Sequence, residues 1–157
     1  GHVSSSSDPA PFVVDPPTAN ILNVSFKDIS EMSKVTIQLL DEIQDGFNRH
    51  DVPDILSRFT DDGIWLMASG PIAPDGRVCR GKEEIGSVLS ARYEKIPDMR
   101  WEEIKHWIVD DTKAISEWIV RGTFEDKSQL DCLGCDLWEF RDGLITKKDT
   151  YWKIITN

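Results

Sequence analysis

The chain has 157 residues, 39% of them hydrophobic, which is enough for one globular domain with a buried core. It carries 28 Asp and Glu against 18 Lys and Arg, a net charge of −10, and no stretch concentrates the basic residues. Such a charge repels phosphate backbones, so we expect no nucleic-acid partner. No apolar run approaches the roughly 20 residues that a membrane-spanning helix needs, so we expect no membrane partner.

The N-terminal segment differs from the rest of the chain. Residues 3–27 are rich in Ser and Pro without a sustained hydrophobic period, so we expect a flexible arm over residues 1–27 and a domain over residues 28–157. Gly1-His2 is typical of a cloning remnant, which leaves an upstream signal peptide as an open alternative. Three cysteines are an odd count and indicate no disulfide framework, so we expect a reducing, cytoplasmic location.

Helix signals dominate the sequence before residue 100. Apolar residues that recur every three or four positions predict an amphipathic first helix of about five turns. The elements predicted here are, in chain order, a helix from Asp28 or Ser30 to Phe47, a helix capped by Asp51 and ended by Asp61-Asp62-Gly63, a strand over Ile64–Ala68, a loop over Gly70–Gly76 and a helix over Lys82–Tyr93.

From residue 100 the pattern changes to strands separated by short polar turns. The predicted strands are Arg100–Val109, Lys113–Phe124, Gln129–Phe140 and Leu144–Ile155. Asp142-Gly143, between the last two strands, is a strong signal for a tight hairpin. Helices followed by an antiparallel meander predict an α+β domain in which a curved sheet folds over its helices.

Asp136 stands in the middle of a predicted strand, where acids are uncommon. Strand alternation places it on one face with Trp138, and we expect that face to point inward. Carrying the alternation to the neighbouring strands predicts a set of further inward residues: Ile104, His106, Ile108, Ile115, Glu117, Ile119, Arg121, Thr123, Thr146, Lys148, Thr150 and Trp152. The opposite, outer face is expected to expose Trp118, Val120, Cys135 and Leu137, enough apolar surface to predict a homodimer joined through it.

Each candidate has an alternative interpretation. Asp136 is either a pocket acid or a solvated acid at a sheet edge, and His106 either relays protons with it or is only hydrogen-bonded. Glu117 and Arg121 are either a substrate clamp or a structural ion pair. Cys132 and Cys135, three apart in a strand, face opposite sides, so we expect no metal site there.

Four short motifs occur in the chain in this order: FNRHDVPDILSRFTDDGIW, RGKEEI, GTF and GCDLWEFRDGLI. Over about residues 33–155 their order and spacing resemble the SnoaL-like branch of the NTF2-like superfamily. The resemblance implies a cone-shaped fold, in which a strongly curved antiparallel sheet wraps three helices and leaves an internal, mostly apolar pocket. That superfamily includes ketosteroid isomerase, polyketide cyclases and proteins that only bind partners, so the fold alone selects no function.

The resemblance also implies roles for single residues. The last two strands are similar to those of ketosteroid isomerase, with Asp136 at the position of an acid that donates to the substrate oxyanion and Trp152 at a pocket tryptophan. Met67 and Ile43 stand where that family has its general base and its oxyanion tyrosine. One catalytic residue of three is present, so classical steroid isomerisation is not expected.

Two hypotheses therefore follow from the sequence. The first is a lyase or isomerase, cyclase- or dehydratase-like, that uses no cofactor or metal and acts on a small, largely apolar carbonyl or polyketide-like compound. Its catalytic residues would be Asp136 and His106. Its substrate-binding residues would be Trp152, Glu117, Arg121, Lys148, Trp138, Met67, Ile43 and Ile119. The second hypothesis is a noncatalytic ligand-binding or dimerisation module.

Overall fold

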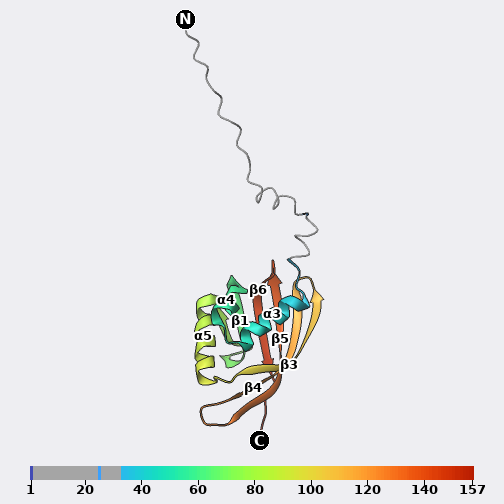
Figure 1. Cartoon of the computed structure of the whole chain (residues 1–157). Coiled ribbons are helices and arrows are strands. Elements are labelled where there is room, and N and C mark those ends of the chain that lie inside the picture. Colours follow the sequence, from blue (N-terminus) through green and yellow to red (C-terminus); the bar gives the residue numbers. More distant parts are fainter. Residues whose placement is uncertain (2–24, 26–32) are drawn as a thin grey trace. The chain divides into compact units, whose positions relative to one another are not determined.

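The structure, a computed structural model, describes Gly1, Ser25 and residues 33–157 (Figure 1). Most of the predicted N-terminal arm, and residues 28–32 of the predicted first helix, lie outside the described residues. Contacts divide the chain into a unit over Gly1–Met32 and a unit over Ser33–Asn157. The second unit contains every helix and strand of the described part that is named below.

In residues 33–157 three helices precede or interrupt the sheet: α3 (Ile37–Asn48), α4 (Val52–Ser57) and α5 (Gly81–Lys95). α3 begins at Ile37, because the side chain of Thr36 caps it by accepting a hydrogen bond from the backbone N–H of Leu39 at 3.1 Å. The predicted first helix is therefore interrupted at residues 34–36, and its predicted start at Asp28 or Ser30 lies outside the described residues. The predicted cap of α4 is confirmed, since the Asp51 carboxylate accepts from the N–H of Asp54 at 3.1 Å. None of the helices in the described part has the length and apolar content that crossing a bilayer requires.

Six strands form one sheet in the order β2-β1-β6-β5-β4-β3. They are β1 (Phe59–Ile72), β2 (Gly76–Arg80), β3 (Arg100–Asp110), β4 (Lys113–Thr123), β5 (Gln129–Arg141) and β6 (Leu144–Trp152). The four C-terminal strands are confirmed within a few residues and form the predicted meander. β1 pairs parallel with β6, so the sheet is mixed and not purely antiparallel. The α+β class predicted from the sequence is confirmed, since the described helices pack against a single sheet.

Two predictions about the β1 region were wrong. Asp61-Asp62-Gly63 does not end an element but lies inside β1, where the register with β6 shifts between Phe59 and Ile64. The predicted loop over Gly70–Gly76 contains the end of β1 at Ile72 and the start of β2 at Gly76. A bulge absorbs the turn-like residues, so the strand continues through them.

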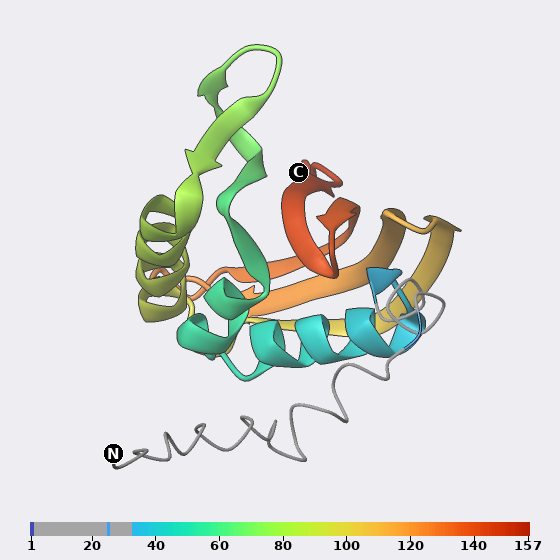
Figure 2. The same cartoon turned by 90° about the horizontal axis from the view of Figure 1, so that it is seen from above.

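The sheet is strongly curved, and the helices lie on its inner side (Figure 2). α3 packs against β3, whereas α5 packs against β1 and β2. Curvature coincides with irregular pairing: Glu103 has a φ of 52° between the Glu102 and Lys105 pairs of β3. A second shift lies between Glu139 and Phe140 of β5. Bulges of this kind bend a strand and increase its twist.

The space between helices and sheet is filled mainly by aromatic side chains. Trp101 makes edge contacts with three other rings, at centroid distances of 5.8 Å to Phe47, 6.5 Å to Tyr93 and 6.4 Å to Trp118. Trp118 and Val120 are fully buried, although we predicted both on the outer face. The interior behind β4 and β5 is therefore a packed aromatic core.

The predicted hairpin between β5 and β6 is confirmed. Arg141 pairs with Leu144, so the turn has two residues. Asp142 and Gly143 both have positive φ, at 51° and 77°, as a type I′ turn requires. This turn, with the shift at Phe140, sets which residues of β6 lie opposite Asp136.

Candidate functional site

Four neighbouring strands each place one polar side chain in a row across the inner face of the sheet. His106 of β3 pairs with Ser116 of β4, Ser116 with Asp136 of β5, and Asp136 with Thr150 of β6. Residues opposite one another in a sheet point to the same face. The row crosses an otherwise apolar core, so its hydrogen bonds must be satisfied within the protein.

Asp136 lies at the centre of this row and is only 1% exposed. Its Oδ1 accepts hydrogen bonds from Lys148 Nζ and from the Thr150 hydroxyl, both at 2.6 Å. Its Oδ2 accepts from the indole N–H of Trp118 at 3.0 Å. The inward orientation predicted for Asp136 is confirmed, but the carboxylate is held by the protein on both oxygens.

Lys148 is buried with Asp136 and surrounded by aromatic rings. Its Nζ lies 5.2 Å from the ring centre of Phe47, 5.1 Å from that of Trp65 and 5.3 Å from that of Trp138. It also donates to the Thr150 hydroxyl oxygen at 2.8 Å. Burial lowers the pKa of Lys148 from its ordinary value, and the adjacent carboxylate opposes that effect. The inward position predicted for Lys148 is confirmed.

His106 belongs to a second, separate group of hydrogen bonds. Its Nδ1 lies 2.7 Å from the Ser116 hydroxyl, which accepts from the indole N–H of Trp138 at 2.8 Å. Its Nε2 lies 3.1 Å from Asp41 Oδ1 on α3. Burial lowers the pKa of His106, with Asp41 opposing it. The pattern fits a neutral ring that donates from Nε2 and accepts at Nδ1.

The predicted partnership of His106 with Asp136 does not appear in this geometry. Within the described residues no hydrogen bond joins the His106–Ser116 group to the Asp136–Lys148 group. Trp138 lies between them and contacts both. The indole of Trp138 donates to Ser116 and lies beside Lys148. A proton relay between His106 and Asp136 would therefore require a rearrangement of the core.

Three predicted substrate-binding residues face the wrong way. Glu117, Ile119 and Arg121 alternate with the buried Ser116, Trp118 and Val120, so they lie on the outer face of β4. Arg121 there forms ion pairs with Glu102 and Asp131. The connection between β4 and β5 has five residues, 124–128, because β4 ends at Thr123 and not at Phe124. A shift of one residue in register reverses every side chain of a strand.

The other predicted binding residues are on the inner side. Ile43 and Trp138 are buried in the core, and Met67 is nearly buried at the edge of a cavity. Trp152 is half-buried against the core, and its indole N–H is the buried side-chain polar group without a hydrogen-bond partner in the part of the chain that is described. Of these four residues only Met67 lines the cavity.

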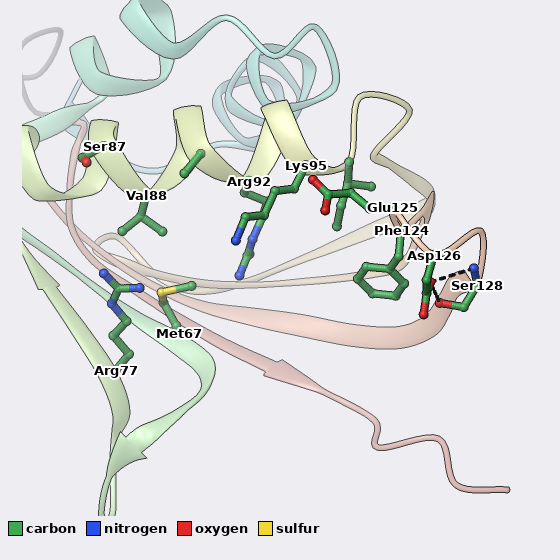
Figure 3. A pocket seen from close by; sticks show the side chains of 12 residues that line it. Met67, Arg77, Ser87, Val88, Arg92, Lys95, Phe124, Glu125, Asp126 and Ser128 are labelled. Carbon is green, nitrogen blue, oxygen red and sulfur yellow. Dashed lines mark hydrogen bonds between the residues drawn. The ribbon is translucent and has the colours of Figure 1, made fainter.

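A cavity of about 740 Å³ lies between α5, β1, β2 and the β4–β5 connection (Figure 3). Met67, Val88, Ala91, Ile96 and Phe124 supply its apolar wall. Its polar wall consists of Arg77, Ser87, Arg92, Lys95, Glu125, Asp126 and Ser128. Neither Asp136 nor His106 lines it. The volume is in the range of small-molecule sites.

Arg92 links this cavity to the buried ion pair. Its guanidinium carbon lies 5.3 Å from the ring centre of Trp65 and 5.4 Å from that of Trp152. Trp65 also contacts Lys148 and donates its N–H to the Thr150 hydroxyl at 2.9 Å. The indole of Trp65 therefore touches both the cavity-lining guanidinium and the Asp136 group. Burial lowers the pKa of Arg92 from its ordinary value.

Sequence reasoning did not find the cationic wall. Arg92 and Lys95 come three apart at the end of α5, and Arg92 follows Val88 by four, so all three share a helix face. That spacing was a usable signal for Arg92. Arg77 had none, because β2 was not predicted.

Metal ligands do not cluster in the described residues: no group of three or more His, Cys, Asp or Glu is placed to hold an ion. Cys132 is buried and Cys135 half-buried, on alternate sides of β5. That arrangement agrees with the opposite faces expected from their spacing.

Comparison with known proteins gives a family match and a set of similar folds. A family model described as a SnoaL-like domain matches residues 40–148. No curated protein has a sequence that matches this chain. A provisionally assigned polyketide cyclase from Xanthomonas campestris pv. campestris has 19% identity and a TM-score of 0.65, covering 82% of this chain and 93% of that one.

Two further solved structures are alike. A protein with a ketosteroid isomerase-like fold from Catenulispora acidiphila, in complex with trimethylamine, has 14% identity and a TM-score of 0.66, covering 76% of this chain and 88% of that one. A provisionally assigned isomerase from Bacillus subtilis has 16% identity and a TM-score of 0.62, covering 80% and 88%. At these identities the likeness establishes the fold alone.

Proposed function

The chain belongs to the SnoaL-like domain family, and from that premise we propose that it binds a small, partly apolar organic compound in the α5 cavity and converts it by an isomerase- or cyclase-type reaction. The reaction would use acid–base groups of the protein and no cofactor. The free thiols of Cys79, Cys132 and Cys135 fit a reducing, cytoplasmic location.

One observation carries this proposal: the indole of Trp65 lies between Arg92, a cavity-lining residue, and the buried ion pair. On one side the ring contacts Arg92, which lines the cavity. The same ring contacts Lys148, which binds Asp136 at 2.6 Å. A carboxylate and an ammonium group behind Arg92 and Trp65 at a small-molecule cavity are suitable groups for proton transfer next to a carbonyl.

The chemistry available to this pair is limited and specific. The Asp136 carboxylate can accept a proton from a carbon next to a carbonyl, and the Lys148 ammonium can stabilise the enolate oxygen that results. Returning the proton to another carbon gives isomerisation, whereas attack of the enolate on a second carbonyl gives cyclisation. Arg92 and Trp65 have to move aside for either reaction, because neither Asp136 nor Lys148 lines the cavity.

The second candidate is a noncatalytic binding module. It is favoured by the same acid, since both oxygens of Asp136 are already bound by protein donors and the side chain is 1% exposed. His106, the other predicted catalytic residue, is engaged with Ser116 and Asp41. Both candidates require a ligand in the cavity, and they differ in whether that ligand changes.

Turnover of a cavity ligand distinguishes the two candidates. A compound that co-purifies with the chain is identified by mass spectrometry and incubated with protein in deuterated water. For an isomerase or cyclase, NMR detects deuterium in the compound or a new product. The double variant Asp136→Asn/Lys148→Met is expected to lose this by about 10²–10⁴-fold, the usual contribution of an acid–base group. The control Asp131→Asn changes a surface acid of the same strand.

The outcome decides as follows. Loss of exchange in the double variant but not in Asp131→Asn supports the enzyme. A compound that stays unchanged and undeuterated with the wild-type protein supports the binding module. Exchange at full rate in the double variant would place the chemistry on other residues.

Classical steroid isomerisation is not expected under either candidate. Met67 occupies the position expected of the general base and has no ionisable group, and Ile43 is buried in the core. A general base typically supplies about 10²–10⁴-fold in rate. An absorbance assay with a Δ5-3-ketosteroid should show no conversion above the uncatalysed rate. Conversion within tenfold of an authentic isomerase would contradict the placement of Met67.

A further inference from the structure

Positive charge without a carboxylate partner collects on the wall of the α5 cavity. Most arginines of the described part form ion pairs with acids: Arg49, Arg58, Arg100, Arg121 and Arg141. Within the same residues, Arg77, Arg80 and Arg92 have no carboxylate within 4 Å of their side-chain nitrogens, and Arg77 and Arg92 line the cavity. In a chain with a net charge of −10, acids are abundant, so unpaired arginines are unexpected.

Arg92 is held in place without being neutralised. Its side chain is half-buried, and its guanidinium lies over the rings of Trp65 and Trp152. Contacts of this kind stabilise a cation but leave its N–H donors unused. No hydrogen bond from the Arg92 side chain to a protein acceptor is present among the described residues. Its fork of N–H groups is therefore available to a planar, two-oxygen acceptor.

The two ends of the cavity differ in charge. In Figure 3, Arg77 and Met67 lie toward the β1–β2 side, Arg92 projects from α5, and Phe124 and Asp126 lie toward the β4–β5 connection. The Asp126 carboxylate accepts hydrogen bonds from the backbone N–H of Ser128, at 2.9 Å, and from the Ser128 hydroxyl. These bonds stabilise the local turn. An anion is attracted to the arginine end and repelled from the acidic end.

We propose that the α5 cavity binds a small organic carboxylate, with its carboxylate held by Arg92 and Arg77 and its apolar body against Met67, Val88 and Phe124. The inference concerns the same cavity as the proposed function and names its ligand class, but it requires binding only. A carboxylate matches a guanidinium with two parallel hydrogen bonds, which a neutral or cationic head group cannot form.

Three probes that share one apolar body test the charge preference: 4-phenylbutanoate, 4-phenylbutan-1-ol and 4-phenylbutylamine. Titration is followed by tryptophan fluorescence, because Trp65 and Trp152 contact Arg92, and by ligand-observed NMR. We expect the acid to bind about tenfold or more tightly than the alcohol, as a charge-assisted pair supplies. The amine is expected to bind most weakly, and added salt should weaken only the acid.

Variants assign the preference to the cavity. Arg92→Met keeps an unbranched stem on the two rings and removes the charge, so it should abolish the difference between acid and alcohol. Arg77→Met should reduce it and provides a second measurement if Arg92→Met folds poorly. Arg80→Met is the matched control, because Arg80 is an unpaired, exposed arginine of the same strand as Arg77 and does not line the cavity.

Several results would overturn the inference. These are equal binding of acid and alcohol, a preference that Arg80→Met removes as fully as Arg92→Met, or no binding of any probe at millimolar concentration. Organic phosphates or sulfonates that bind more tightly than the acid would also replace the carboxylate as the ligand class. Failure of the proposed function looks different: the acid preference persists while no compound is turned over.

Discussion

At the scale of single residues, Asp136 and Lys148 are charged groups that are buried away from water and contact each other. Removing two ions from water costs several kcal/mol each, and the 2.6 Å contact offsets this cost only because Thr150 and Trp118 bind the remaining lone pairs. Such a pair tolerates the loss of both members better than the loss of one. The stability of the core therefore depends on keeping the two charges matched.

Asp136→Asn should accordingly destabilise the fold, because it leaves the Lys148 ammonium buried without a counter-charge. We expect a loss of about 3–5 kcal/mol in the free energy of unfolding, the usual effect of breaking a buried pair. The double variant Asp136→Asn/Lys148→Met should recover most of the loss, since Met suits the aromatic surroundings of Lys148. Urea unfolding followed by tryptophan fluorescence measures both.

Asp131→Asn is the control for this comparison, because its pair with Arg121 is on the surface, where such pairs contribute about 0–1 kcal/mol. If Asp136→Asn unfolds within about 0.5 kcal/mol of the wild type, the acid is not the buried, paired group described above.

His106 gives a separate, pH-dependent effect. Burial lowers the pKa of His106 in the folded chain, and Asp41 opposes this shift. In an unfolded chain a His side chain has a pKa of about 6.5. As the pH falls below that value, the unfolded chain takes up a proton that the folded chain resists. The unfolded state then binds more protons, so stability falls as the solution becomes more acidic and is fully recovered above the unfolded pKa.

Replacing His106 with Gln should remove this part of the acid sensitivity. We expect the difference in unfolding free energy between the wild type and His106→Gln to change between about pH 7 and pH 5 and to be constant above pH 7. Asp41→Asn should extend the sensitive range toward acid, because it removes the charge that raises the pKa of His106. Parallel stability–pH curves for the wild type and His106→Gln would contradict the prediction.

At the scale of elements, turn lengths determine which residues the sequence could place. The Asp142-Gly143 turn is recognisable, so Lys148, Thr150 and Trp152 could be assigned to the face of Asp136. The connection over residues 124–128 has no such signature, and placing the end of β4 at Phe124 reversed Glu117 and Arg121. Both faces of β4 carry apolar residues, so hydrophobic alternation could not correct the error.

Other elements were hidden for different reasons. β2 follows a stretch rich in Gly and Pro, a composition that predicts a loop. Its strand structure depends on pairing with β1, which the sequence pattern does not reveal. The candidate site was the part that the sequence predicted least well. Arg92 and Arg77 come from α5 and β2 and line one cavity only in the folded chain. Periodicity predicts elements well, but it cannot predict which cations are left without an acid.

The start of α3 is an element-scale difference that can be measured. Thr36 accepts from the N–H of Leu39, so Thr36→Ala should cost about 0.5–2 kcal/mol in unfolding free energy. Thr36→Ser retains the hydroxyl and should cost much less. Chemical denaturation of the two variants provides the comparison, and equal effects of Ala and Ser would show that the helix does not begin at Ile37.

At the scale of the whole molecule, the residues that the structure describes leave the outer face of the curved sheet uncovered. Large apolar side chains on that face include Leu133 and Leu137, at 37% and 39% exposed, and Tyr151, at 53%. Trp118 and Val120, which we expected on this face, are instead buried on the inner face. Neighbouring outer positions are half-buried isoleucines, Ile115 and Ile119, which pair with Leu137 and Leu133. The face thus carries an apolar strip across β4 and β5, interrupted by Glu117 between the two isoleucines.

We expect two copies of the chain to bury this strip as a twofold-symmetric homodimer. Leu137 lies opposite Ile115 in the strip, so Leu137→Lys would place charge in the interface. Light scattering at micromolar concentration should give twice the chain mass for the wild type and one chain mass for Leu137→Lys. Ile154→Lys, at an 88% exposed position beyond β6, should remain dimeric. A single-chain mass for the wild type would mean that the strip is exposed in solution, and a dimer that persists in Leu137→Lys would place the interface elsewhere.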